Sequence, residues 1–238
     1  GRATVSLGYI GLYEVGTVFY GPDWEKNPEA KAFTLEVVKK MHDACAKWEK
    51  EDPNHYHYSV YSTPSESLTD RFCRLDTEKF GKVKDITDKE YYTNSFHIPV
   101  YFDINAFDKI RLEAPYHALT NGGHITYVEL DGEAQKNVRA IAKIVKVMFD
   151  EGIGYGSINH PVDTCHNCGY KGVIYDKCPV CQSENILRMR RITGYLTGDL
   201  SSWNSAKRAE EKDRVRILLL HLEIHNQQMV LKVKNLCP

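Results

Sequence analysis

The hydrophobic positions of this chain follow a helical period in two long segments. Apolar side chains recur every three or four residues in 28–50 and again in 133–151, which predicts two amphipathic helices. The first should end near Asp52, because a residue before proline avoids the helical region. The expected buried faces are Ala32, Leu35, Val38, Met41, Ala44 and Ala46 in the first helix, and Val138, Ile141, Ala142, Val145, Met148 and Phe149 in the second.

Other segments alternate polar with aromatic or β-branched residues, which is typical of strands. This pattern predicts strands over 55–62, 94–103 and 125–130, and a strand or buried loop over 3–20. A turn followed by a further helix is expected in "TPSESLTDRFCRLD", residues 63–76. Strands that alternate with helices indicate an α/β fold.

Composition narrows the classes of function. The 238 residues carry a formal net charge of −1, so a broad basic face for nucleic acid is not expected. No run of 18 apolar residues occurs, so no membrane span is predicted. The first residues lack a signal-peptide pattern, which favours a reducing, cytoplasmic setting. The chain also begins within what looks like a folded segment, which indicates a fragment.

Four of the seven cysteines form two CxxC pairs, with the pattern Cys165-x2-Cys168-x9-Cys178-x2-Cys181. Each pair can place two thiolates on one metal ion, and four thiolates complete the closed tetrahedral shell of a structural zinc site. Iron, two disulfides or four unrelated thiols are the alternatives. The spacing favours zinc, and metal binding should supply much of the folding energy of so small a module.

Two further segments have a plain structural interpretation beside a functional one. "YSTPSESL" ends an expected strand and opens an expected helix, with Ser62, Thr63 and Ser65 as capping residues and Pro64 in the first helical turn. The free amide groups of a helix N-terminus also suit a phosphate. The basic residues of 188–208 are interpreted as a solvated face balanced by Glu210, Glu211 and Asp213.

The order of several motifs resembles the C-terminal part of the anaerobic (class III) ribonucleoside-triphosphate reductases, which are glycyl radical enzymes. The similar stretches, within residues 1–215, are "GRATVSLGYIGLYE", "STPSESLTDRF", "YYTNSFHIPV", "LTNGGHITYVEL", "GYGSINHPVDTCHNCGY" and "RRITGYLTGDLSSWNSAKRAEEKDRV". The resemblance implies part of a ten-stranded α/β barrel. It also implies that Gly194, in the Arg-x-x-Gly-Tyr motif, carries the radical and that the four cysteines hold zinc near it.

The same resemblance implies the remaining site and its partners. Substrate phosphates would bind the turn of Ser62, Thr63, Ser65, Glu66 and Ser67. A separate radical-SAM activating enzyme, with an iron–sulfur cluster and S-adenosylmethionine, would generate the glycyl radical. A cysteine thiyl would then abstract the ribose 3′ hydrogen of a ribonucleoside triphosphate, with formate as reductant, in an enzyme expected to be a homodimer.

The chain departs from the family in three places. Thr193 stands where many glycyl radical enzymes carry Cys, Ser or Ala. The thiyl cysteine of the family lies N-terminal to this region, and Cys45 and Cys73 are interpreted as buried structural thiols. The tail 217–238 is atypical, with Cys237 an incidental thiol.

These features predict four parts: a barrel portion (1–160), a zinc-binding four-cysteine module (161–186), a radical loop with a charged segment (187–216) and the tail (217–238). The chain alone is expected to be inactive in nucleotide reduction. The alternatives are another glycyl radical enzyme such as a formate-lyase relative, a radical-bearing spare part or remnant without its own catalysis, and a zinc-ribbon nucleic-acid module.

Overall fold

The computed structural model describes residues 3–62, 65–131, 137–174, 176–192, 195–197, 200–215 and 217–218. Strands and helices alternate along most of the chain, which confirms the α/β class. The first half contains β1 (Thr4–Gly8), α1 (Leu12–Tyr20), η1 (Trp24–Lys26), α2 (Pro28–Glu51), β2 (His57–Tyr61), α3 (Leu68–Phe80) and α4 (Ala106–His117). The second half contains β3 (Thr126–Asp131), α5 (Val138–Asp150), β4 (Gly156–Asn159), β5 (Val162–Cys165), β6 (Lys171–Gly172), β7 (Ile186–Ile192), β8 (Tyr195–Thr197), η3 (Leu200–Ser202), α6 (Ser205–Asp213) and β9 (Ile217–Leu218).

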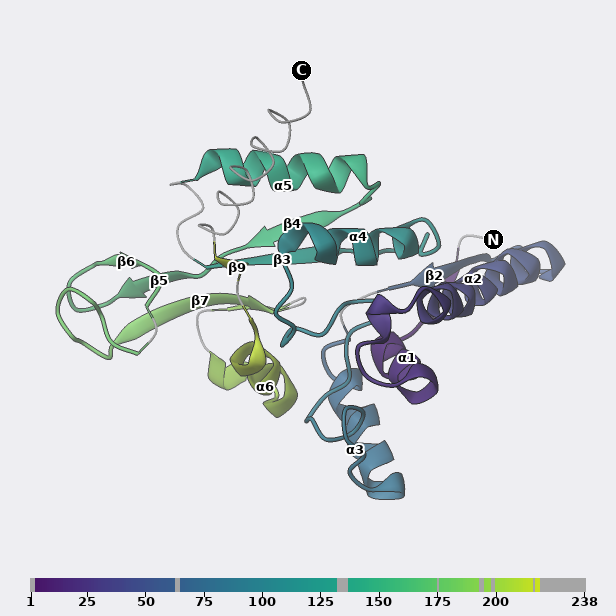
Figure 1. Ribbon diagram of the computed structural model, residues 1–238, viewed down its shortest axis with the longest axis horizontal. Helices are drawn as coiled ribbons and strands as arrows, with labels where there is room; N and C mark the ends of the chain where they lie inside the picture. The colour runs from purple at the N-terminus through teal and green to yellow at the C-terminus, as the bar shows by residue number, and fades with distance from the viewer. Residues whose placement is uncertain are drawn as a thin grey trace, which may run out of the picture.

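The body is built on parallel strands. β1 pairs with β2, and β3 lies between β4 and β9, in each case parallel. The end of β2 is linked to the segment before β3, because Ser62 donates its amide to the Gly123 carbonyl and Gly122 donates to Val60. The helices pack beside these strands, whereas β5, β6 and β7 extend away from them as an antiparallel ribbon (Figure 1).

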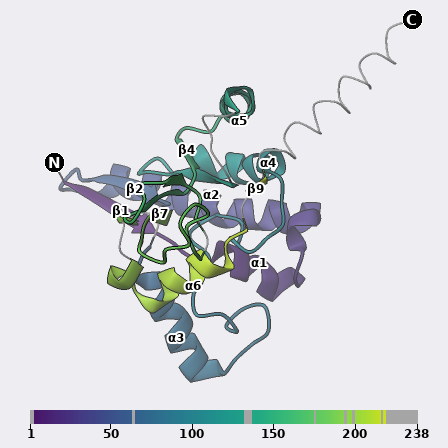
Figure 2. The same ribbon diagram turned by 90° about the vertical axis from the view of Figure 1, so that its left-hand side faces the viewer.

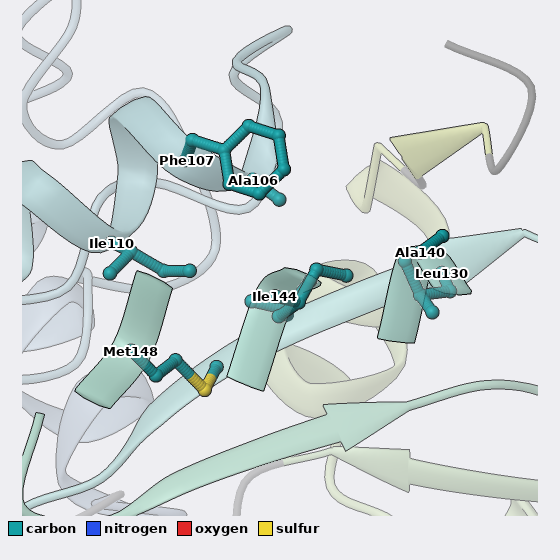
Figure 3. Close-up of a cluster of buried hydrophobic side chains, with 8 residues drawn as sticks. Ala106, Phe107, Ile110, Leu130, Ala140, Ile144 and Met148 are labelled. Carbon is teal, nitrogen blue, oxygen red and sulfur yellow. The ribbon is translucent and has the colours of Figure 1, made fainter. Parts of the chain in front are cut away.

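The largest apolar core fills the space between α4, α5 and β3. Ile110, Ile144 and Leu130 are completely buried there, one from each element (Figure 3). Burying such side chains contributes about 1.5–3 kcal/mol each. A second core packs α2 against α4 and the segment around Phe96, and in the rotated view α1 lies below α2 (Figure 2).

The two predicted long helices are present, with corrections to their buried faces. α2 has Val38 at the centre of its buried face, but Ala32 and Ala46 are exposed. α5 turns Ala140, Ile144 and Met148 inward, whereas Phe149 is 83% exposed. Val138 and Val145 of the predicted face are also exposed. In α5 the buried Ala140 and Ile144 each lie one position before a predicted residue, whereas the predicted Met148 is buried and the predicted Ile141 packs against the core.

Three other predictions are wrong. Residues 12–20 form α1, not a strand, and a Cβ built on its Gly16 would lie 2.3 Å from the Trp24 ring. Segment 94–103 is irregular and mostly buried, with a single bridge from Asn94 to Ile10. Helix α3 begins at Leu68, so Ser65 is not its cap, and the actual N-cap Ser67 makes no side-chain capping bond.

Candidate functional site

The four cysteines of the CxxC pairs converge on one point. Their sulfur atoms all lie within 4.8 Å of one another, and the Cys165–Cys181 and Cys168–Cys178 sulfurs are 3.5 Å apart. A tetrahedral zinc site with bonds of about 2.3 Å separates its sulfurs by about 3.8 Å. The separations are much longer than a disulfide bond of about 2.05 Å. The cluster therefore has the size of a zinc–thiolate shell.

Backbone turns prepare both halves of this cluster. The Gly169 amide donates to the Cys165 carbonyl at 2.9 Å, and the Gln182 amide donates to the Cys178 carbonyl at the same distance. Gly169 and Gln182 both have positive φ, 74° and 59°. Hydrogen bonds from the Asn167 side chain and the Ser183 backbone lower the pKa of the Cys181 thiol to about 6. A thiol that ionises this readily suits a metal ligand, because the thiolate is the binding form.

One strand connects the cysteine cluster to the predicted radical glycine. β7 pairs antiparallel with β5, where Ile186 faces Cys165, and with β8, where Ile192 faces Tyr195. Thr193 and Gly194, which join the last pair, lie outside the described residues. Six residue steps separate Ile186 from Ile192, or about 20 Å along the strand. The cysteines therefore fix the base of the hairpin at a distance from its tip.

One face of the charged segment after the hairpin is buried, which corrects the expectation of a solvated face in part, because Arg208 and Lys212 are exposed. Lys207 and Glu210 of α6 are essentially inaccessible and form an ion pair of 2.5 Å. Arg214, which ends the helix, pairs with Glu129 of β3 at 2.7 Å. The sequence did carry a signal for a shared buried face, because positions 207, 210 and 214 lie on one side of a helix.

The proposed phosphate turn lies beside the start of α6. Ser62 is fully buried, and the Ser65 amide donates to Asn94 Oδ1 at 3.1 Å. The Glu66 carbonyl accepts a bond of 2.7 Å from the side chain of Asn204, the N-cap of α6. Ser67 is exposed at the start of α3, and Thr63 lies outside the described residues. The structure thus brings this turn against the segment that follows the hairpin.

Two histidines and two cysteines outside the cluster lie in structural surroundings. Both ring nitrogens of His97 face backbone carbonyls, those of Asn94 and Ile125. His124 Nδ1 lies 2.7 Å from the Thr120 carbonyl oxygen. Cys45 and Cys73 are buried on α2 and α3, and the Cys73 thiol donates to the Lys89 carbonyl. These contacts agree with a structural role for all four residues.

Comparison with known proteins identifies the family. Residues 1–216 match the family model described as anaerobic ribonucleoside-triphosphate reductase. The chain belongs to this family. The resemblance drawn from the sequence motifs is therefore confirmed.

Named relatives of the reductase family agree with the family model. The anaerobic ribonucleoside-triphosphate reductase of Escherichia coli strain K12 is 41% identical over 228 residues, which is 92% of this chain and 32% of the relative. The enzyme of that name from phage T4 is 37% identical over 91% of this chain and 35% of its own length. This chain thus spans about a third of these relatives.

Solved anaerobic ribonucleotide reductases share the fold. One structure aligns with a TM-score of 0.75 at 22% identity, covering 91% of this chain and 34% of its own. The Thermotoga maritima enzyme in complex with dATP and CTP aligns with a TM-score of 0.69 at 21% identity, covering 88% and 34%. Within the described part of this reductase-family chain, no helix is long and apolar enough to cross a bilayer.

Proposed function

We propose that this chain is the C-terminal, radical-bearing portion of an anaerobic ribonucleoside-triphosphate reductase, with Gly194 as the radical residue. The observation that carries the proposal is the single strand, β7, that joins a four-cysteine cluster to the hairpin of residues 192–195 in a chain of this family. Residues 1–160 contribute to a ten-stranded barrel, 161–186 form the metal module, 187–216 carry the radical loop, and 217–238 are an added tail.

Gly194 suits this role for chemical reasons. A radical on its α-carbon is stabilised by the two flanking amides, and glycine has no Cβ to strain the planar centre. A separate activating enzyme with S-adenosylmethionine would supply the acceptor for one hydrogen atom. Gly194 would give up one α-hydrogen to that acceptor. The bond broken is a Cα–H bond, so the chain itself stays intact.

Nucleotide reduction then needs a cysteine from outside this chain. Its thiol gives a hydrogen atom to the Gly194 radical, and the thiyl so formed takes the 3′ hydrogen of the ribose. The ribonucleotide loses its 2′ hydroxyl as water while formate is oxidised to carbon dioxide, so two electrons balance. Cys45 and Cys73 do not fit the thiyl role, because both are buried on helices away from the hairpin strand.

The four cysteines would hold zinc, which supplies a fixed cross-link and no redox chemistry. Asn167 and the backbone turns at Gly169 and Gln182 orient the thiolates. Substrate triphosphate would lie against the turn of Ser62, Thr63, Ser65, Glu66 and Ser67, close to Asn94 and Asn204. A radical-SAM activating enzyme is the required partner, and the whole reductase is proposed to be a cytoplasmic homodimer.

Anaerobic electron paramagnetic resonance tests the radical assignment. The zinc-loaded chain is incubated with activating enzyme, S-adenosylmethionine and a reductant. We expect a doublet that collapses to a singlet when the protein is made with α-deuterated glycine, and chain cleavage at residue 194 after exposure to air. Thr193→Ala, with a residue common in the wider family, should keep the doublet, and Gly194→Ala should abolish it.

Two outcomes contradict the proposal. A doublet that persists in Gly194→Ala would place the radical elsewhere. A folded, zinc-loaded chain that shows neither signal nor cleavage, while the same activating enzyme works on a full-length reductase, would make this chain a remnant.

A further inference from the structure

Helix α6 joins the hairpin to three separate parts of the body. Its N-cap Asn204 binds the Glu66 carbonyl, and Asp213 near its end accepts a bond of 2.8 Å from the Tyr91 hydroxyl. Val215, two residues after Asp213, donates its amide to the Val100 carbonyl at 2.8 Å. In Figure 1 α6 lies directly beside the strand β7. The helix is thus held at both ends.

The Arg214 side chain bonds both to this body and to the hairpin strand. Its Nη1 donates to the Arg191 carbonyl at 3.0 Å and to Glu129 Oε1 at 2.7 Å, and its Nη2 lies 3.5 Å from Glu210 Oε1. Its side chain is 6% exposed. Burial opposes the charge of this guanidinium, but the carboxylates of Glu129 and Glu210 outweigh it and raise the pKa of Arg214.

The Glu129 carboxylate on β3, which accepts from Arg214, is itself held in place. Glu129 receives a second bond, of 3.0 Å, from the Asn159 side chain, and Glu129 and Asn159 are paired residues of β3 and β4. Glu210 is fixed in turn by Lys207. The guanidinium therefore links a rigid pair of parallel strands to a backbone carbonyl three residues before Gly194. The guanidinium uses Nη1 for Glu129 and the Arg191 carbonyl and Nη2 for Glu210, whereas the single nitrogen of a lysine would have to serve all three acceptors.

We propose that Arg214 is a positioning residue, which locks the end of β7 to β3 and so sets where the turn of Thr193 and Gly194 lies. The role given to the turn rests on the proposed function. The bonds by which Arg214 joins β7 to β3 do not depend on that function. Hydrogen transfer requires reacting atoms about 3–3.5 Å apart, so a small displacement of the turn would slow it strongly. The cysteine cluster holds the far end of β7, about 20 Å away. Arg214 holds the near end.

Backbone hydrogen exchange of the full chain tests the lock without any radical. In Arg214→Gln we expect amide exchange to rise about tenfold in peptides covering 186–197, with α2 and α5 unchanged, because only local opening becomes easier. Arg214→Lys should give a smaller rise. The matched control is Arg111→Lys, which alters an exposed arginine paired with Asp108 and Glu151 and should leave the exchange of 186–197 as it was.

The activated chain supplies a readout that a purely structural role would not change. We expect the glycyl doublet of Arg214→Lys to broaden, because the turn samples several orientations, and cleavage in air to accelerate. Hydrogen exchange at the wild-type rate in 186–197 of a folded Arg214→Gln chain would overturn the proposal. If that variant does not fold, Arg214→Lys and Glu129→Gln decide it by the same criterion. If Gly194 proves not to carry the radical, the hydrogen-exchange result still decides whether Arg214 holds the end of β7.

Discussion

At the scale of single residues, buried carboxylates replace the backbone partners that a sheet would provide. Glu14 on α1 accepts both the amide and the hydroxyl of Thr93, at 2.9 and 2.7 Å. Glu113 on α4 accepts the Ile98 amide at 3.0 Å and also binds Lys109. An irregular buried segment needs such partners, because unpaired amides away from water are costly. These two carboxylates therefore hold segment 91–100 in place without a strand.

His117 should make stability depend on pH. Burial, with a smaller contribution from His124, lowers its pKa from 6.5 to about 4 in the folded chain. The unfolded chain therefore binds a proton first as pH falls, and stability is lost between about pH 6.5 and pH 4, by roughly 3 kcal/mol at most. The Gly154 amide donates to its Nδ1 and Thr126 lies 2.8 Å from its Nε2, as a neutral ring requires.

Urea unfolding at several pH values measures this effect. His117→Gln should flatten the pH dependence in that window, whereas His55→Asn, at an exposed histidine, should keep it. An equal slope in His117→Gln and in the unsubstituted chain would show that other groups cause the loss.

At the scale of elements, the cysteine ribbon depends on its metal. Its apolar cluster consists of little more than Ile174, Cys165 and Cys178, with partly buried neighbours. So small a core cannot offset the conformational entropy of the ribbon, so metal binding should supply the difference. The α4–α5–β3 core is separate and should not need the metal.

Metal removal tests this dependence. A chelator should raise hydrogen exchange throughout 162–192 and leave α5 protected. Cys168→Ser should reduce bound zinc well below about one per chain. Cys73→Ser, at a buried thiol on α3, should not change the zinc content. Protection of the ribbon that survives complete metal removal would contradict the role given to zinc.

Sequence patterns predicted the elements whose signals are local. α2 with its stop before Pro53, β2, β3 and the cysteine cluster followed from spacing alone. α1 and α4 were missed, since glycines interrupt one and Pro115 lies inside the other. The burial of Arg214 was misjudged, because its partners, the Glu129 carboxylate and the Arg191 carbonyl, are distant in sequence. Long-range pairing of this kind cannot be read from local charge balance.

At the scale of the whole molecule, the parallel strands described here are proposed to form part of a larger barrel. The chain covers about a third of its relatives, and its described parallel strands are β1, β2, β3, β4 and β9. A barrel encloses its site only when all strands are present. The proposed radical loop and the proposed phosphate turn are in this chain, whereas the thiyl cysteine is proposed to lie outside it.

The activated chain should therefore carry the radical but not reduce nucleotides. We expect no deoxynucleotide from a radiolabelled ribonucleoside triphosphate with formate under anaerobic conditions. A full-length reductase activated in parallel provides the positive control. Turnover by this chain alone, lost in Gly194→Ala, would show that a thiyl cysteine is present after all.

The length of β7 determines which face the end of this strand presents to its neighbours. Successive residues of a strand point to opposite faces, and six residue steps separate Ile186, which pairs with Cys165, from Ile192, which pairs with Tyr195. Insertion or deletion of one residue between them would turn the hairpin tip over and present its opposite face to β3. Changes of two residues would keep the face but shift the tip by about 7 Å. The length of the strand between the cysteine cluster and residue 192 is thus constrained in both phase and reach.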